Sequence, residues 1–287
     1  MSKDNLGDRM KSYEDSYRIH VPNRMPIILR IDGKAFHSYT KGCKRPIDEN
    51  LVQVMNETAT YLCKNIQNCQ LAYVQSDEIS LLLVNYKSLD TQSWFDNNLQ
   101  KMVSVSSAMA SSIFTANSWK IWGKELVNGG IQAWGVFPED IKPAMFDSRA
   151  FVLPKEDVAN YFLWRQQDAT RNSVQMLART LYSHNELKNK VNSELQDLCW
   201  QKGVNWNDCP TSQKRGRCVI KTKSMKQGTN PKTGEVYTTE RSEWTVDNEI
   251  PIFSQDRQYI EKYVYPMLGV KLLSNTGDIV TINDHGI

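Results

Sequence analysis

The chain has 287 residues, of which 40% are hydrophobic and 23% charged, and its formal net charge is +3. This composition is that of an ordinary globular protein with enough chain for a sizeable core, and it excludes a disordered chain. A net charge so close to zero does not by itself require a nucleic-acid partner. The longest uncharged stretch, residues 102–119, contains six serines and is too polar to span a membrane.

The cysteines and the first residues bear on the compartment of the protein. The chain is charged from its third residue, and no apolar run typical of a signal peptide follows. Its six cysteines form no C-x-x-C pair, and none of its four histidines stands at zinc-finger spacing from a cysteine. We therefore expect reduced thiols, no structural zinc site and a cytoplasmic location.

Apolar patterning predicts a strand, a helix and a hairpin at the start of the chain. Residues 25–31, MPIILRI, form a short apolar run that ends at an Asp-Gly pair, which is typical of a buried strand. Residues 48–66 carry apolar side chains at helical spacing, with Asp48 in position to cap the helix. The strand-like runs 71–74 and 79–86 flank the residues QSDE, which predicts a hairpin.

A second helix and a fourth strand complete this pattern. Residues 102–119 place Met102, Ser106 and Ala110 on one helix face, where small side chains let a helix lie close to a sheet. Residues 131–137, IQAWGVF, are the fourth strand candidate. The order strand, helix, strand, strand, helix, strand is the split βαβ or ferredoxin-like arrangement, which polymerase palms and nucleotide cyclases share. We predict an α+β fold with an antiparallel sheet packed against helices.

The second half of the chain is expected to pack on this palm. We place a palm domain at residues 1–140 and a C-terminal part at residues 141–287, the two forming one compact unit. The patterning of the C-terminal part predicts a strand over residues 146–154, a long helix over 157–183 and a loop or hairpin over 203–234.

Three acidic residues stand where this fold would bring them together. Asp32 ends the first strand, and Asp77 and Glu78 lie at the hairpin turn, so they can share one edge of the sheet. Clustered carboxylates repel unless a cation neutralises them, and Mg²⁺ binds carboxylates, backbone carbonyls and substrate phosphates. Gly33 has no side chain to block its carbonyl from a metal or a phosphate. Either acidic pattern alone is usual in a solvated turn, so the patterning leaves a metal site and simple turn residues as alternatives.

Five motifs carry a resemblance to a known family. RIDGKAFH, RPID, QSDEIS, FDSR and YFLWRQQDATRNS occur in this order between residues 30 and 173. Together they resemble the tRNA-His guanylyltransferase family, in particular its bacterial Thg1-like branch, from about residue 10 to at least residue 225. RIDG…FH and QSDE are highly specific when both occur.

The resemblance implies a polymerase-like palm that works in the opposite direction. Family members add nucleotides to the 5′ end of tRNA, so that the chain grows from 3′ to 5′. ATP activates the 5′-monophosphate by forming an adenylylated RNA end, and the 3′-hydroxyl of the incoming nucleotide then expels AMP. The resemblance also implies two Mg²⁺ ions, ATP and GTP as substrates, the tRNA acceptor stem as partner, and a homotetramer.

The resemblance also implies roles for individual residues at this site. Arg30 and Lys101 would hold triphosphates, because cationic side chains stabilise the charge that builds on transferring phosphates. The catalytic residues would be Asp32, Asp77 and Glu78, and the metal ligands would be Asp32, Asp77 and the Gly33 carbonyl. The nucleotide-binding residues would be Arg30, Asp32, Gly33, Lys34, Ala35, Phe36, His37, Arg45, Asp48, Ser76, Asp77 and Lys101.

A basic run in the second half is the candidate contact with tRNA. Residues 213–226 contain several lysines and arginines and no acidic residue. Such a run is often only a solvated face, but in a tRNA enzyme it would contact phosphates without reading sequence. The expected tRNA contacts are Arg165, Arg171, Asn172, Lys214, Arg215 and Arg217, with ion pairing to Asp168 as the alternative for the arginines of the long helix.

Two motifs depart from the family pattern. Residues 45–48 read Arg-Pro-Ile-Asp where the family has Lys-Pro-Asn-Asp, so Arg45 replaces a phosphate-binding lysine and Ile47 removes a polar contact. Residues 170–173 read Thr-Arg-Asn-Ser where eukaryotic members have His-Ile-Asn-Asn, a motif tied to adding an extra G to tRNA-His. We therefore expect template-dependent repair of 5′-truncated tRNA rather than dedicated G addition.

Other functions compete with this interpretation. Dedicated G addition to tRNA-His is one alternative, and a non-catalytic ferredoxin-like RNA-binding protein is another. The latter would need exposed aromatic side chains on the central strands, and the first strand, IILRI, has none. A cyclase of the same palm would need neither the long helix nor the basic run.

Overall fold

The structure is a computed structural model that describes residues 5–128, 143–229, 233–265, 270–273 and 279–282. The helices are α1 (Asn5–Asp15), α2 (Phe36–Tyr39), α3 (Glu49–Asn65), α4 (Leu99–Asn128), α5 (Lys155–Leu181), α6 (His184–Leu187), α7 (Asn192–Gln201), α8 (Thr211–Arg215) and α9 (Gln258–Val264), with short 3₁₀ turns η1 (Trp94–Asn97) and η2 (Trp206–Asp208). The strands are β1 (Ile27–Gly33), β2 (Cys69–Gln75), β3 (Glu78–Leu83), β4 (Phe146–Val152), β5 (Arg217–Thr229), β6 (Val236–Asp247), β7 (Val270–Leu273) and β8 (Ile279–Ile282).

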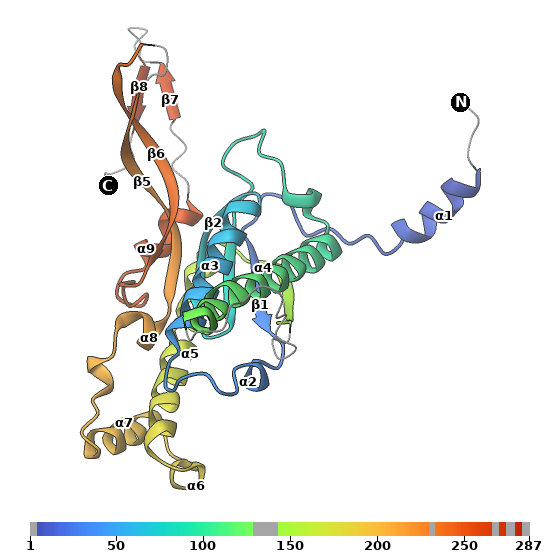
Figure 1. Cartoon of the computed structure of the whole chain (residues 1–287). Helices are drawn as coiled ribbons and strands as arrows, with labels where there is room; N and C mark the ends of the chain where they lie inside the picture. Colours follow the sequence, from blue (N-terminus) through green and yellow to red (C-terminus); the bar gives the residue numbers. More distant parts are fainter. Residues whose placement is uncertain (1–4, 129–142, 230–232, 266–269, 274–278, 283–287) are drawn as a thin grey trace.

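The centre of the molecule is a six-stranded antiparallel sheet in the order β4-β1-β3-β2-β5-β6 (Figure 1). The first four of these strands, with α3 between β1 and β2 and α4 between β3 and β4, form the ferredoxin-like unit. The predicted α+β fold class is therefore confirmed. Strands β7 and β8 form a separate two-stranded sheet.

The strand that completes the ferredoxin-like unit differs from the predicted one. Strand β4, residues 146–152, pairs with β1 along its whole length. The predicted strand over residues 131–137 lies outside the described residues. The sheet continues across the predicted division at residue 140, because β4 and β5 both come after it. The division into two parts remains a prediction.

Strand β1 is apolar on both faces at its start and polar on one face at its end. Ile27, Leu29 and Ile31 are at most 2% exposed and pack in the core cluster beneath α3 and α4, whereas Ile28 packs in the cluster beneath α5. Burying one such side chain contributes about 1.5–3 kcal/mol. Because successive side chains alternate in direction, Asp32 lies on the same face as Ile28. The end of β1 thus presents a carboxylate at the point where the core stops.

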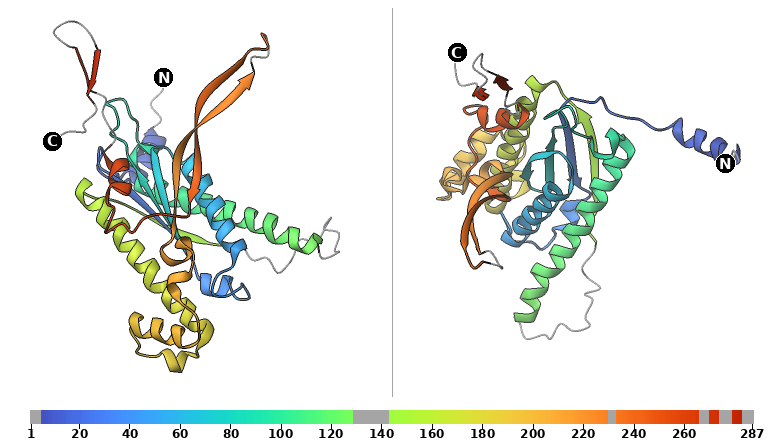
Figure 2. Two further views of the ribbon diagram at one scale, coloured as in Figure 1. Left: turned by 90° about the vertical axis from the view of Figure 1, so that its left-hand side faces the viewer. Right: turned by 90° about the horizontal axis from the view of Figure 1, so that it is seen from above.

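Helices α3 and α4 cover one face of the sheet, and α5 and α9 cover the other (Figure 2). Helix α3 begins as predicted, since the Asp48 carboxylate accepts hydrogen bonds from the backbone N–H groups of Asn50 and Leu51 at 3.0 and 3.2 Å. Helix α4 lies close to β4, where the buried Ser106 hydroxyl contacts the Ser148 hydroxyl at 2.8 Å. Because helices cover both faces of the central strands, an RNA-binding protein that uses an open sheet face is excluded.

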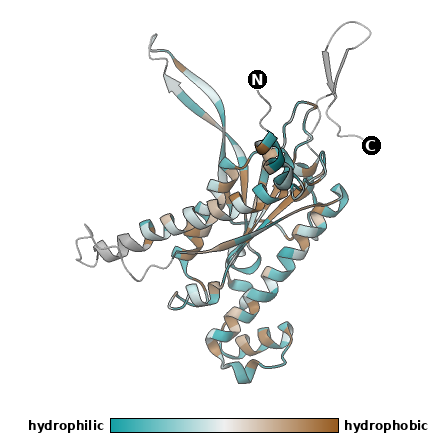
Figure 3. Ribbon diagram, turned by 90° about the vertical axis from the view of Figure 1, so that its right-hand side faces the viewer, coloured by the Kyte–Doolittle hydropathy of each residue, from teal (hydrophilic) through white to brown (hydrophobic). Residues whose placement is uncertain are grey.

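Strands β5 and β6 form a long ribbon that leaves the body of the protein (Figures 1 and 2). Only residues 217–220 of β5 pair with β2, and the rest of β5 pairs only with β6. Figure 3 shows apolar segments concentrated along the central strands and polar ones along much of the ribbon. The predicted loop or hairpin over residues 203–234 thus contains one strand of this ribbon, preceded by α8.

Two further expectations concern the thiols and the membrane. All six cysteines are free thiols, as predicted. Within the described ranges, every helix is too short or too polar to cross a lipid bilayer.

Candidate active site

The end of β1 and the β2–β3 turn bring Asp32 and Asp77 to one edge of the sheet. Asp32 is the register partner of Glu78, and the Gly33 N–H donates to the Asp77 carbonyl at 3.1 Å. Ser76 holds the turn with a positive φ of 45°, a conformation that L-residues adopt at a cost and that is enriched at functional sites. The predicted convergence of the two strand ends is therefore present.

The pKa values of both aspartates are raised, chiefly because their carboxylates are partly buried. The pKa of Asp32 is raised by burial first and then by the neighbouring charges of Asp77, Glu78 and Asp147, while Arg30 opposes the shift. The pKa of Asp77 is likewise raised, mainly by burial, although a hydrogen bond from Ser76 opposes it. A cation between the two carboxylates would relieve this crowding.

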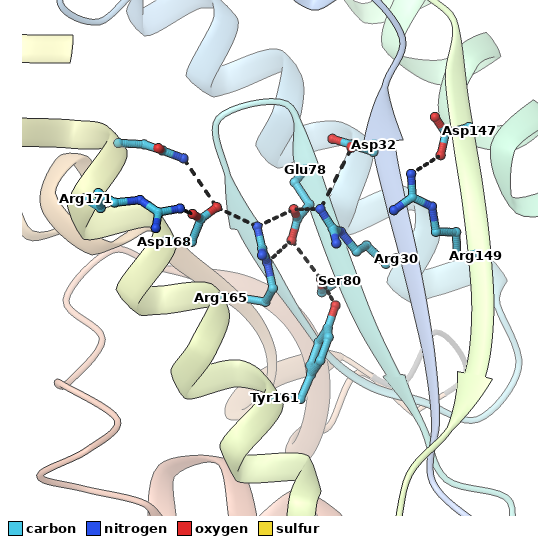
Figure 4. Close-up of polar contacts among 11 residues, drawn as sticks. Arg30, Asp32, Glu78, Ser80, Asp147, Arg149, Tyr161, Arg165, Asp168 and Arg171 are labelled. Atoms are coloured by element: carbon cyan, nitrogen blue, oxygen red, sulfur yellow. Dashed lines mark hydrogen bonds and ion pairs between the residues drawn. The ribbon is translucent and has the colours of Figure 1, made fainter. Parts of the chain in front are cut away.

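Glu78, the third predicted catalytic acid, is instead held by two arginines (Figure 4). Arg165 donates to both of its carboxylate oxygens, at 2.8 and 2.7 Å, and Arg30 approaches it to 3.0 Å. The Glu78 side chain is only 6% exposed. Because its charge is neutralised by arginine on two sides, Glu78 supports the site and is not arranged as a metal ligand. Its predicted catalytic role remains a prediction.

The arginine network continues along α5. Arg165 also bonds to Asp168 at 2.8 Å, and Asp168 in turn pairs with Arg171 (Figure 4). Arg165 is 4% exposed, so it cannot contact tRNA directly in this structure, and the alternative of ion pairing with Asp168 is the one observed. The Arg171 side chain is 61% exposed and remains a candidate contact, as does the exposed Asn172.

Two further charged residues, Asp147 and Arg149, belong to the site but were not assigned from the sequence. On β4, Asp147 is the register partner of Asp32, and Arg149 is the register partner of Arg30. Two acidic residues and two basic residues therefore lie opposite each other on the paired strands. The sequence signal was present in the motif FDSR, but the pairing could be found only once β4 was placed beside β1. Their mutual ion pair, at 3.7 Å with both side chains more than half exposed, is weak.

The lack of a side chain at Gly33 also makes room for Phe36. A Cβ atom at this position would lie 2.3 Å from the Phe36 ring, which therefore occupies the space of the missing side chain. Phe36 is 4% exposed and packs against Tyr39, Phe114 and Phe146 with ring centroids 5.0–5.3 Å away. The glycine thus lets a buried aromatic cluster form directly behind the aspartates. Its backbone carbonyl remains a candidate metal ligand.

A cavity of about 450 Å³ opens beside Asp77. This volume is within the range of small-molecule sites. Its wall combines the segment from α2 to the start of α3, the β2–β3 turn, the second half of α5, and the α8 region. The predicted site residues that line it are Phe36, His37, Arg45, Asp48, Ser76, Asp77, Asn172 and Arg217.

Asp48 shapes this cavity through the backbone. Besides capping α3, its carboxylate accepts a hydrogen bond from the Lys44 N–H at 3.0 Å, so it fixes the loop that carries Arg45. Lys34 and Ala35 are exposed but do not line the cavity, and Ala35 adopts a left-handed backbone conformation before α2. Their predicted contacts with a nucleotide remain predictions.

Lys101 does not fit its predicted role within one chain. It lies in the first turn of α4, where Leu99 bonds to Ile19 before β1 begins. The part of α4 that reaches the site is ten residues further on, where Ser111 accepts a hydrogen bond from the backbone N–H of Phe146, the register partner of Gly33. Ten helical residues span about 15 Å. The lysine is therefore at the far end of the sheet from Asp32.

The basic residues of the run 213–226 lie in different environments. Arg217 is 4% exposed, bonds to Asn56, and has its pKa lowered to about 10 by burial, so it is no free phosphate contact. Lys223 and Lys226 pair with Glu240 and Glu243 of β6. Lys214 and Arg215 are half-buried in α8 and remain predicted tRNA contacts. Acidic residues of β6, distant in the sequence, thus neutralise part of the run.

The described residues contain no group of three or more His, Cys, Asp or Glu side chains suited to a metal ion. Asp32 and Asp77 are the predicted side-chain ligands of a cation at this edge. The Gly33 carbonyl, substrate phosphates and water would complete its shell, which is the pattern that Mg²⁺ accepts. Crowded carboxylates at the end of a palm sheet, beside such a cavity, are the arrangement of a nucleotidyl-transferring palm enzyme.

Comparisons with known proteins agree with this assignment to the nucleotidyl-transferring enzymes. A family model described as tRNAHis guanylyltransferase matches residues 7–154, and the chain belongs to this family of nucleotidyltransferases. A solved bacterial tRNA(His) guanylyltransferase-like protein in complex with ATP is 45% identical, with a TM-score of 0.76, covering 91% of this chain and 99% of its own. The corresponding structure in complex with GTP is 44% identical, with a TM-score of 0.69, covering 91% and 100%. A probable tRNA(His) guanylyltransferase of Drosophila melanogaster is 27% identical over 226 residues, covering 74% of this chain and 72% of its own.

Proposed function

We propose that this protein adds nucleotides to the 5′ end of tRNA in the 3′–5′ direction and repairs 5′-truncated tRNA. The observation that carries the proposal is the pair Asp32 and Asp77 at one edge of the sheet, both with raised pKa values, with Asp77 lining the cavity. The similar bacterial structures in complex with ATP and GTP support both nucleotides as substrates. The tRNA acceptor stem as partner and a tetrameric assembly rest on the family resemblance alone.

The proposed reaction has two steps. First, an oxygen of the RNA 5′-monophosphate attacks the α-phosphorus of ATP, and pyrophosphate leaves. Second, the 3′-hydroxyl of the incoming nucleotide attacks the activated 5′-phosphorus, AMP leaves, and the hydroxyl proton passes to water. Each step transfers a phosphorus group between oxygens, so positioning and charge stabilisation supply most of the catalysis.

Asp32, Asp77 and the Gly33 carbonyl would hold Mg²⁺ at this site. When bound, Mg²⁺ supplies positive charge to the phosphates and lowers the pKa of the attacking hydroxyl. Two ions are the expectation from the family, and the paired carboxylates with raised pKa values fit this need for cations. The Arg30 guanidinium lies 4.0 Å from the Asp32 carboxylate and would bind phosphate oxygens beside the metal ligands.

The second half of α5 supports repair over dedicated G addition. Asn172 and Ser173 line the cavity, and Arg171 at this end of α5 is exposed. In this chain, therefore, the positions of the His-Ile-Asn-Asn motif present no histidine to the cavity. The nucleotide to be added would then be chosen by pairing with the opposite strand of the acceptor stem.

A primer-extension assay tests the proposal. The protein is incubated with Mg²⁺, nucleotides and a tRNA that lacks its first residue and carries a 5′-monophosphate. We expect a product longer by the templated nucleotide, with an adenylylated intermediate when only ATP is present. Changing the opposite template base should change the nucleotide added. A protein that extends only tRNA-His, and only with G, would support dedicated G addition, and the absence of extension and of the intermediate would refute the proposal.

Replacing Asp77 with Ala should abolish extension while the fold is kept, as judged by circular dichroism. Asp90, an acidic residue in the loop between β3 and η1, gives a matched control as Asp90→Ala. Substantial extension by Asp77→Ala would contradict the assignment of this carboxylate.

A further inference from the structure

One wall of the cavity carries a tryptophan that none of the sequence motifs includes. Trp206, the first residue of η2, lines the same cavity as Asp77. The residue is half-buried, because its side chain also packs against the hydrophobic cluster between α5 and α7. An indole that is anchored in this way and still lines a cavity offers a flat apolar surface on which a nucleobase can stack.

Polar contacts fix the orientation of this indole. Its Nε1 atom donates to the Ser173 hydroxyl at 3.0 Å. That hydroxyl lies 2.8 Å from the Thr170 carbonyl and 3.1 Å from the Lys214 carbonyl, either of which can accept its proton. The Lys214 ammonium bonds to the Asn207 carbonyl and lies 5.7 Å from the centroid of the Trp206 ring, within cation–π range. The ring is therefore oriented before a ligand binds, which reduces the entropic cost of binding.

A buried arginine lines the same cavity. Arg217, the first residue of β5, is 4% exposed. Its guanidinium bonds to the Asn56 side chain and lies 3.5 Å from the Val52 carbonyl, and both of these partners are uncharged. Burying a charge without a charged partner is costly, so a ligand that brings further acceptor atoms is favoured here. The ring nitrogens and carbonyl oxygens of a nucleobase are such acceptors.

We propose that Trp206 and Arg217 recognise the base of a nucleoside triphosphate in the cavity, the indole by stacking and the guanidinium by donating to acceptor atoms of the base. Ser173, from the segment that departs from the family pattern, is the positioning residue that orients the indole. The inference rests on the proposed function, in which the phosphates lie at the cation held by Asp77. This placement of the phosphates leaves the aromatic wall to the base.

The test measures how much the base adds to binding. Calorimetric titrations with Mg²⁺ give the ratio of the Kd of ribose 5-triphosphate, which lacks a base, to the Kd of ATP. A stacked base contributes about 5- to 150-fold in affinity, so the ratio of the wild type should be at least about 5. Trp206→Ala should lower the ratio and leave the Kd of ribose 5-triphosphate unchanged, whereas Trp206→Phe keeps a ring and should retain most of the ratio. Trp200→Ala, at an exposed tryptophan on α7, is the matched control and should behave as the wild type.

Two further variants test the other parts of the proposal. Ser173→Ala removes the acceptor of the indole N–H and should lower the ratio, whereas Ser173→Thr keeps a hydroxyl and should restore it. Arg217→Met should lower the ratio and leave the Kd of ribose 5-triphosphate unchanged. If Arg217→Met weakens ATP and ribose 5-triphosphate equally, the arginine contacts a phosphate, and its assignment to the base is overturned.

The inference is overturned if Trp206→Ala keeps the ratio of the wild type, or if the wild type binds ATP no more tightly than ribose 5-triphosphate. An unchanged ratio with a raised KM for tRNA would place RNA at this wall and would likewise overturn it. Failure of the proposed function gives a different result, because the wild type would then not extend RNA, whereas the ratio of the two Kd values can still be measured. Should Trp206→Ala fail to fold, Ser173→Ala and Trp206→Phe still decide, since a wild-type ratio in the former or a ratio near one in the latter contradicts stacking on an oriented ring.

Discussion

Replacing Glu78 with Ala should destabilise the protein rather than remove a metal ligand. The variant leaves the guanidinium of Arg165, which is 4% exposed, without the carboxylate that now accepts two of its hydrogen bonds at 2.7 and 2.8 Å. Breaking a buried ion pair from one side costs about 3–5 kcal/mol. For a chain of 287 residues, such a loss lowers Tm by roughly 5–8 °C. Differential scanning calorimetry with and without Mg²⁺ measures the change.

A second variant makes the reasoning sharper. Replacing Arg165 with Met in the Glu78→Ala background removes the buried guanidinium, for which Asp168 would be the remaining carboxylate partner, so part of the lost stability should return. The magnitude of the recovery measures how strongly the two side chains are coupled. A Glu78→Ala protein with the Tm of the wild type but without activity would refute a supporting role and restore Glu78 as a catalytic acid. A double variant no more stable than the single one would refute the stranded charge as the cause.

The remaining predictions concern the aspartates and the glycine behind them. Asp32→Asn should abolish extension without lowering Tm, because the pKa of Asp32 is raised in the folded protein, so its ionised form destabilises the fold. As the pH rises from 3.8, the ordinary pKa of an aspartate, through the raised pKa of Asp32, the wild type should lose stability relative to Asp32→Asn. A series of thermal melts over this pH range that shows the opposite slope would contradict the prediction. Mg²⁺ at about 100 times its Kd should stabilise the wild type by about 2.7 kcal/mol, and a calorimetric titration should show a much smaller effect in Asp77→Asn. Gly33→Ala should destabilise the protein by about 1–3 kcal/mol, because the new methyl group lies 2.3 Å from the Phe36 ring, and Phe36→Leu in the same chain should recover part of the loss in urea unfolding.

Local periodicity was enough to predict the elements that form the palm. The helical spacing of residues 48–66 and the cap at Asp48 correspond to α3, and the two runs around QSDE correspond to β2 and β3. These signals are local, since a helix face and a hairpin turn are each defined within about twenty residues. The order of the elements then fixed the topology, because few arrangements of such an order avoid crossing connections.

The partners of the charged side chains could not be predicted in the same way. Arg165 and Glu78 are 87 positions apart, and their pairing depends on how α5 crosses the sheet. The sequence motif alone therefore grouped Glu78 with the catalytic acids and showed nothing of its arginine partners. Similarly, Lys101 was assigned by its position in the family, whereas the direction of α4 carries it to the other end of the sheet.

The charges at the site connect metal binding to nucleotide binding. Asp32, Asp77, Glu78 and Asp147 supply four carboxylates, against the guanidinium groups of Arg30, Arg149 and Arg165. An incoming triphosphate adds further negative charge, and two of these arginines are already engaged by Glu78. The arginines alone therefore cannot neutralise the loaded site, so the cation and the nucleotide should each raise the affinity of the other. By linkage this increase is equal in both directions, and a Kd for ATP that is independent of Mg²⁺ would show that Asp32 and Asp77 are not the link between them.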